Sequence, residues 1–211
     1  MLPGSEWCNG ILRQWWQAAS IAFFVLPLPA GAELLVGIDE QAKLPFWEVK
    51  DAAMSLRLVQ RLPDQTRAFF LARGFTREQT ERIAQSCVFQ TVFHNTSERN
   101  QPGPLQYDLR EWSIEVGNRP RKLKTRESWG SEWPPDQVSD AARLALEWSL
   151  YPTQQTYQAG DYNWGMATFD LPPGTRFQLT LYWHQYGERH SFTIKDIQCA
   201  PDATLEPEES L

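Results

Sequence analysis

The sequence predicts a mainly β protein, an antiparallel β-sandwich with a small two-helix insertion. Short alternating segments of apolar and polar residues recur along the chain, and Gly, Pro and Asn residues separate them. The clear helical patterns lie within residues 63–86, and Pro134-Pro135-Asp136 begins a turn or a short helix, so nothing indicates the regular strand–helix–strand alternation of a parallel sheet. We expect an immunoglobulin-like strand order, because Pro172-Pro173-Gly174 precedes an alternating strand, a hairpin and a last strand that ends in Cys199.

The alternating segments define the strands that we expect, and these are 34–38, 54–59, 88–94, 109–116, 144–150, 167–171, 177–183 and 190–197. In segment 144–150 apolar residues from Leu144 to Leu150 alternate with small or polar ones, which is typical of a strand with one buried face. We therefore expect Trp148 in the core, together with Trp112 and Trp183.

Two short helices are expected before the strand at 88–94. The first has Asp64 as its cap and ends at Gly74. Thr76 and Gln79 have the spacing of a capping box for the second helix, which runs towards Cys87. Two helices in this order resemble a DNA-binding helix-turn-helix, but the net charge of −6 argues against a nucleic-acid partner.

The first 32 residues read as a cleavable secretion signal. The apolar run from Trp15 to Leu28 is shorter than the ~20 residues that cross a bilayer. Small residues at Ala30-Gly31-Ala32 predict cleavage after Ala32, which leaves a periplasmic or secreted chain without a transmembrane helix. The alternative is an N-terminus retained as an anchor, because Arg13 is the only basic side chain before the apolar run.

We divide the remaining chain into an N-terminal segment with the two helices (33–86), a β-sandwich (87–200) and an acidic tail (201–211). After cleavage two cysteines remain, Cys87 and Cys199, and an even number in an oxidising compartment predicts one disulfide. Neither cysteine has the Cys-x-x-Cys spacing or the adjacent His of a metal site, so paired metal-binding thiolates are the less favoured alternative.

No catalytic motif is visible, so we expect a non-enzymatic accessory protein and no cofactor. A copper-type soft-metal carrier is an alternative, with ligands drawn from His94, His184, His190 and Met166. With a hairpin turn at Gly187-Glu188, His184 and His190 would face opposite sides of the sheet and could not share one ion.

Aromatic loops are the candidate binding elements, and we expect their partner to be another extracytoplasmic or membrane protein. The segment from Gly160 to Met166 combines two glycines, two aromatic residues and an acid, and its candidate residues are Asp161, Tyr162, Asn163 and Trp164. Trp129 and Trp133 lie in Gly-, Pro- and Ser-rich segments, where exposure is expected. The basic run 119–126 adds Arg121, Lys122 and Lys124. A carbohydrate-binding module is the other alternative, because exposed aromatic rings also stack on sugars.

Overall fold

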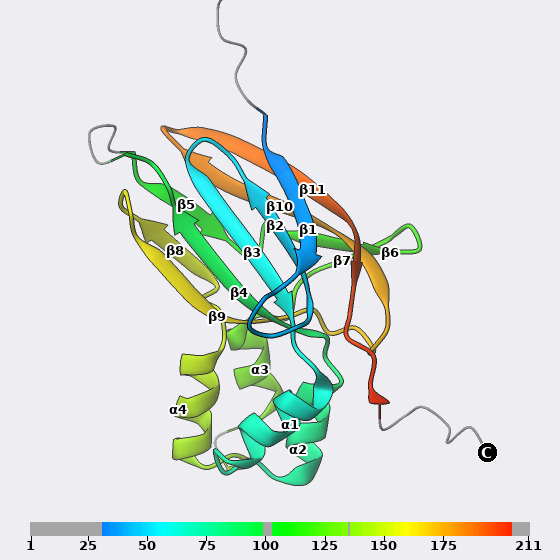
Figure 1. Ribbon diagram of the computed structural model, residues 1–211. Helices are drawn as coiled ribbons and strands as arrows, with labels where there is room; N and C mark the ends of the chain where they lie inside the picture. Colours follow the sequence, from blue (N-terminus) through cyan, green and yellow to red (C-terminus); the bar gives the residue numbers. More distant parts are fainter. Residues whose placement is uncertain (1–30, 99–102, 135, 204–211) are drawn as a thin grey trace, which may run out of the picture.

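The computed structural model describes residues 31–98, 103–134 and 136–203. Two antiparallel sheets pack face to face, and four short helices gather at one end of them (Figure 1). The predicted β-sandwich is therefore confirmed. The expected secretion signal (1–32) and acidic tail (201–211) lie almost entirely outside the described residues and stay predictions. Within the described ranges no helix is long and apolar enough to span a membrane.

The first sheet has the strand order β1-β2-β3-β4-β9. Its strands are β1 (Glu33–Ile38), β2 (Pro45–Lys50), β3 (Met54–Gln60), β4 (Val88–Asn95) and β9 (Tyr162–Thr168). Leu56 and Leu58 on β3 face the second sheet, whereas Arg57 between them faces away from it. Residues 33–60 thus belong to the sandwich, which begins at β1 and not at the boundary that we expected at residue 87.

The second sheet has the order β7-β6-β10-β5-β8, with β11 along the other edge of β10. Its strands are β5 (Leu105–Asp108), β6 (Ser113–Val116), β7 (Arg119–Arg121), β8 (Gln154–Tyr157), β10 (Arg176–Gln185) and β11 (Glu188–Gln198). The strand order differs from the immunoglobulin-like one that we expected. Here the first four strands lie side by side, in chain order, in one sheet, whereas the first four strands of an immunoglobulin domain are divided between two sheets.

The helices number four in the described chain, not the two expected. They are α1 (Pro63–Leu71), α2 (Arg77–Ala84), α3 (Arg126–Glu132) and α4 (Asp140–Ser149). The capping box of α2 is confirmed, since the backbone N–H of Gln79 donates to Thr76 Oγ1 over 3.2 Å and that of Thr76 donates to Gln79 Oε1 over 3.0 Å. The cap of α1 is Leu62, and Asp64 lies in its first turn instead.

The strand expected at 144–150 is wrong, because these residues belong to α4. Ser139 caps the helix by accepting a hydrogen bond from the backbone N–H of Ala142 over 3.2 Å. The helix buries Ala142, Leu146 and Ser149, which are spaced three or four residues apart. Helical spacing therefore decided which residues are buried here, and the alternation of leucines was misleading.

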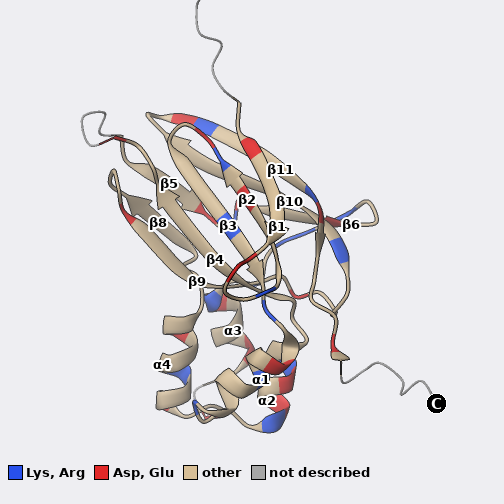
Figure 2. Cartoon of the chain, in the orientation of Figure 1, with Lys and Arg blue, Asp and Glu red and all other residues tan. Residues whose placement is uncertain are grey.

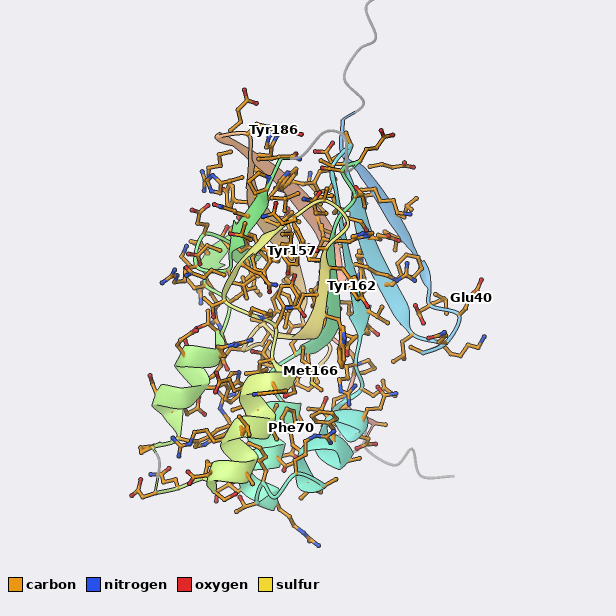
Figure 3. The ribbon with its side chains drawn as sticks, turned by 90° about the vertical axis from the view of Figure 1, so that its left-hand side faces the viewer. Glu40, Phe70, Tyr157, Tyr162, Met166 and Tyr186 are labelled. Atoms are coloured by element: carbon orange, nitrogen blue, oxygen red, sulfur yellow. A yellow bond between two sulfur atoms is a disulfide. The ribbon has the colours of Figure 1, made fainter. Side chains whose placement is uncertain are left out.

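Two apolar cores hold the molecule together. The larger lies between the sheets and includes Trp112 and Trp183, both buried as expected. It also contains three stacked tyrosines, Tyr107, Tyr151 and Tyr157. The hydroxyl oxygen of Tyr157 lies 3.3 Å from that of Tyr151 and 3.5 Å from that of Tyr107. The smaller core lies between the helices and the end of the first sheet; Figure 3 shows Met166 of β9 just above Phe70 of α1 in this region.

Two links fasten the end of β11 to the helical end of the sandwich. The Sγ atoms of Cys87 and Cys199 lie 2.02 Å apart, at disulfide distance, which confirms the predicted pairing. Beyond Cys199, the buried carboxylate of Asp202 accepts hydrogen bonds from Arg67 of α1, and Arg67 Nε also donates to Glu81 of α2 over 2.7 Å. The last described residues are therefore held against both helices.

Replacing Cys87 and Cys199 by alanine together should lower the free energy of unfolding by about 4 to 5 kcal/mol, because the bond closes a loop of 112 residues. Urea unfolding of both proteins, with and without reductant, measures this difference. Reductant should destabilise the wild type alone. An unchanged midpoint in the double variant would show that the bond contributes nothing.

Replacing Glu81 by glutamine should destabilise the protein at neutral pH and not in acid. The hydrogen bond from Arg67 lowers the pKa of Glu81 below its ordinary value. The carboxylate therefore stabilises the fold above its unfolded pKa of about 4.3, and this contribution is lost as the pH falls through the lower folded pKa. Urea midpoints of wild type and Glu81→Gln should differ at about pH 7 and converge once the pH falls below the lowered folded pKa of Glu81.

The matched control is Glu78→Gln, because Glu78 is exposed on the same helix and takes part in no ion pair in the described ranges. It should lower the urea midpoint at about pH 7 by much less than Glu81→Gln does, because only the interaction of Glu78 with the helix dipole is lost. A gap between wild type and Glu81→Gln that persists in strong acid would contradict this assignment.

Candidate functional site

Three aromatic side chains are largely exposed on one side of the molecule. Trp148 on α4 is 81% exposed, and Tyr162 and Trp164 on β9 are 66% and 62% exposed. Leu144, one helical turn before Trp148, is also exposed. We call Leu144, Trp148, Tyr162 and Trp164 the aromatic surface. Figure 2 shows that β9 carries no charged residue.

The position of Trp148 follows from the burial of α4. Because Ala142, Leu146 and Ser149 face the helical core, residue 148 projects from the opposite side of the helix. On β9, Tyr162 and Trp164 alternate with the half-buried Asn163 and so lie on the same face of the strand. Figure 3 shows the ring of Tyr162 on the strand well above the helices.

Gly165 allows α4 and β9 to approach each other. The backbone N–H of Tyr151 donates to the carbonyl oxygen of Met166 over 2.8 Å, and Leu150 bridges to Met166. A Cβ atom on Gly165 would lie 2.9 Å from the Tyr151 nitrogen and Cα, closer than side-chain atoms come to a backbone. The glycine therefore lets the residues that follow α4 lie against β9, which brings Trp148 near Trp164.

Trp148 and Trp164 line one hollow of about 320 Å³. Its polar lining comes from Arg126 at the start of α3, Glu147 of α4 and Asn163 of β9. The amide of Asn163 donates to Gln155 Oε1 over 2.7 Å, which holds its side chain in place. Aromatic walls with a few fixed polar groups between them are typical of binding sites.

Arg126 has unused capacity for hydrogen bonds. Its Nη2 donates to the carbonyl oxygen of Leu150 over 3.0 Å, whereas its buried Nε has no partner. Within the described ranges no carboxylate lies within ion-pair distance of this guanidinium. A half-buried arginine in this state can bind a carboxylate of a ligand.

The predicted binding segment around Asp161 is part strand and part turn. Tyr162, Asn163 and Trp164 belong to β9, and all three lie at or beside the aromatic surface. Asp161 lies in the preceding turn, where its Oδ2 accepts a hydrogen bond from the backbone N–H of Gln158 over 2.8 Å. Asp161 therefore shapes the turn that leads into β9.

The expected exposure of Trp129 is wrong. Its side chain is fully buried, and its Nε1 donates to Thr168 Oγ1 over 3.0 Å. Trp133 is half-buried and stacks on it, with ring centroids 5.0 Å apart. Both rings belong to the smaller core because α3 carries Trp129 inward, so Gly and Ser neighbours were poor indicators of exposure.

The basic residues of the run 119–126 differ in their exposure and in their contacts. Arg121 and Lys122 are exposed at and just beyond β7, and Lys122 Nζ donates to the carbonyl oxygen of Arg110 over 2.8 Å. Lys124 instead forms an ion pair with Glu132 and lies over the ring of Trp129. The run therefore presents fewer free charges than its sequence indicates.

The alternative metal ligands lie in separate places. The hairpin turns at Tyr186-Gly187, one residue earlier than expected, and pairs Trp183 with His190 and His184 with Arg189. The two histidines still face opposite sides of the sheet, because the pairing differs from the expected one by an even number of residues. Across the described ranges, no three His, Cys, Asp or Glu side chains form a group that could hold a metal ion.

His94 and Met166 complete the alternative ligand set. His94 lies on the outer face of the first sheet opposite Tyr162, and Met166 is buried against the helices.

A second hollow, of about 570 Å³, lies on the outer face of the second sheet. His184 Nε2 and Glu111 Oε2 are 3.0 Å apart at its side, and this hydrogen bond is the main cause that lowers the pKa of Glu111. The other residues that line it are the buried Tyr107 and the polar residues Gln106, Asp108, Gln154, Gln155 and Thr156. Without an exposed aromatic side chain, this hollow has less apolar contact to offer than the one beside Trp148.

Sequence reasoning missed Trp148, Arg126 and Glu147 as site residues. Ser139 is a typical cap, and apolar or small residues follow it at positions 142, 146 and 149. This pattern predicts a helix with Trp148 on its exposed side. Arg126 was part of the basic run, but only the fold places it beside Trp164.

No protein-family model matches the chain, and neither the curated proteins nor the solved structures give a match.

Among the tryptophans in the described ranges, Trp148 and Trp164 should react first with N-bromosuccinimide, because their side chains are the most exposed. Trp112, Trp129 and Trp183 are buried and should react only when the protein unfolds. Peptide mapping by mass spectrometry after limited oxidation measures the order. Early oxidation of Trp129 would contradict the packing of α3.

Proposed function

We propose that this protein binds another protein through the aromatic surface, with Arg126 as its anion-recognising residue. The observation that carries the proposal is that two largely exposed tryptophans and an arginine without a carboxylate partner line one hollow. Trp, Tyr and Arg are the residue types that most often dominate binding energy at protein interfaces. Large exposed aromatic groups beside a polar rim are also typical of such interfaces.

The charges around the hollow support a polar partner surface. Arg126 and Glu147 both line it, and no ion pair joins them in the described chain. A partner with a carboxylate near an apolar side chain would satisfy Arg126 while covering Trp148 and Trp164. The disulfide is compatible with a place outside the cytoplasm, where the proposed partner would also act.

A carbohydrate ligand is the second candidate, and Asn163 favours it. Sugar-binding sites combine aromatic platforms with fixed amide and carboxylate groups, and Asn163 and Glu147 flank the two tryptophans here. The adjacent exposed Leu144 and the uncharged strand β9 extend the apolar area beyond one hollow, which favours a protein partner.

The test begins with capture of extracytoplasmic proteins from the native host on the immobilised protein, followed by purification of the captured protein. Calorimetry then measures its affinity for wild type, Trp148→Ala and Trp164→Ala. Each tryptophan should contribute about 2 kcal/mol, so each variant should bind roughly thirty-fold more weakly.

Tyr186→Ala is the matched control, because Tyr186 is 64% exposed at the β10–β11 turn, away from the aromatic surface. It should keep the wild-type affinity, and circular dichroism should show all variants folded. Equal affinity of wild type and both tryptophan variants would refute the proposal. Binding to a glycan array alone, lost in Trp164→Ala, would replace it by carbohydrate recognition.

A further inference from the structure

The outer face of the first sheet carries a hollow of about 550 Å³ that is rich in arginine and glutamine. It lies where β3, β4, the β1–β2 turn and the start of α1 meet. Its polar lining consists of Asp39, Gln41, Arg57, Gln60, Arg61, Gln65 and Gln90. The two arginines in this set differ in one decisive respect.

Arg57 is neutralised by acids of the protein. Its Nη1 donates to Glu48 Oε2 over 2.8 Å, and its Nη2 donates to Asp39 Oδ2 over 2.9 Å. Asp39 also accepts from the backbone N–H groups of Gln41 and Ala42, so this carboxylate is fully engaged. The pKa of Asp39 is lowered, chiefly by the hydrogen bond from Ala42 and then by Arg57.

Arg61 has no such partner. Its Nη2 donates to the carbonyl oxygen of Gln65 over 3.2 Å, and its buried Nε has no partner. No acid within the described ranges forms an ion pair with it. Arg61 is half-buried, and a partly desolvated charge is normally paired, so this guanidinium can accommodate an anion from outside the chain.

The surroundings of Arg61 add to this imbalance. Burial lowers the pKa of Arg61, and the charge of Arg73 lowers it further. Both guanidinium groups lie against the ring of Phe69, and Arg73 also has no ion pair among the described residues. The chain has 26 acidic residues, yet none in the described ranges forms an ion pair with Arg61 or Arg73.

We propose that this hollow is an oxyanion site in which Arg61 binds a carboxylate or phosphate group. Gln65 is placed to help, because its Oε1 accepts from the backbone N–H of Leu62 and its amide N–H groups remain for the ligand. Val92 in the wall pairs directly with Trp164, so the hollow adjoins the aromatic surface. The oxyanion comes either from a small solute or from an acidic side chain of a bound chain.

Thermal unfolding of the whole protein tests the site with sodium phosphate, sodium acetate and an oligo-glutamate peptide, each against sodium chloride of equal ionic strength. A ligand that binds only the folded state raises the unfolding temperature, by about 5 to 10 °C at one hundred times its dissociation constant. We expect this rise in phosphate or acetate for a small solute, and in oligo-glutamate alone for an acidic chain.

Arg61→Met should abolish the rise, and Arg77→Met should keep it, because Arg77 carries the same charge at an exposed position on α2. A rise retained in Arg61→Met, or no rise above chloride with any of the three probes, overturns the proposal. If Arg61→Met fails to fold, the Nε–H resonance of Arg61 in the wild type decides. It should shift on titration with the active probe, and a resonance that stays in place refutes the site.

Discussion

The covalent link between Cys87 and Cys199 is the constraint on which the helical end of the sandwich depends. Cys87 lies between α2 and β4 with a φ of 54°, a left-handed conformation that turns the chain from helix into strand. The carbonyl oxygen of the preceding Ser86 accepts from the backbone N–H groups of Phe169 and Asp170, just after β9. One short segment therefore joins the ends of α2, β9 and β11.

The four helices are a second layer of packing and not an appendage. Val88 and Met166 of the first sheet enter the helical core, where they meet Phe70, Trp129 and Leu146. The hydrogen bond from Trp129 to Thr168 and the ion pair of Lys124 with Glu132 tie α3 to the strands. Because α4 is fixed by this core, the side of α4 that carries Trp148 is held at a set position beside β9.

Local patterns were sufficient for features that depend on neighbours in sequence, such as the capping box at Thr76 and the strands around Phe93 and Leu181. The disulfide was predictable because only two cysteines follow the segment that we expect to be a secretion signal. In α4 two periods competed, since alternating leucines fit a strand while Ala142 and Leu146 fit a helix. Tertiary contact with the helical core decided between them.

The candidate site was harder to predict because its parts come from different elements. Tyr162 and Trp164 were found from the composition of their segment, but Arg126 could be assigned to the site only from the fold, which places it beside Trp164. Likewise, the proposed oxyanion site depends on which arginine has no carboxylate partner. Arg57 is paired with Glu48, which lies on another strand, whereas Arg61 has an Nε without a partner. Sequence shows which charges exist, whereas pairing is a property of the folded chain.

Gly165 gives the aromatic surface a further property. Trp148 and Trp164 come together only when the Tyr151 backbone lies against this glycine, and the two rings belong to a helix and a strand with β8 between them in the chain. No short linear fragment of the chain contains both in their proper arrangement. A partner that needs both rings would therefore recognise a conformational epitope, and it would distinguish the folded protein from a nascent or misfolded copy.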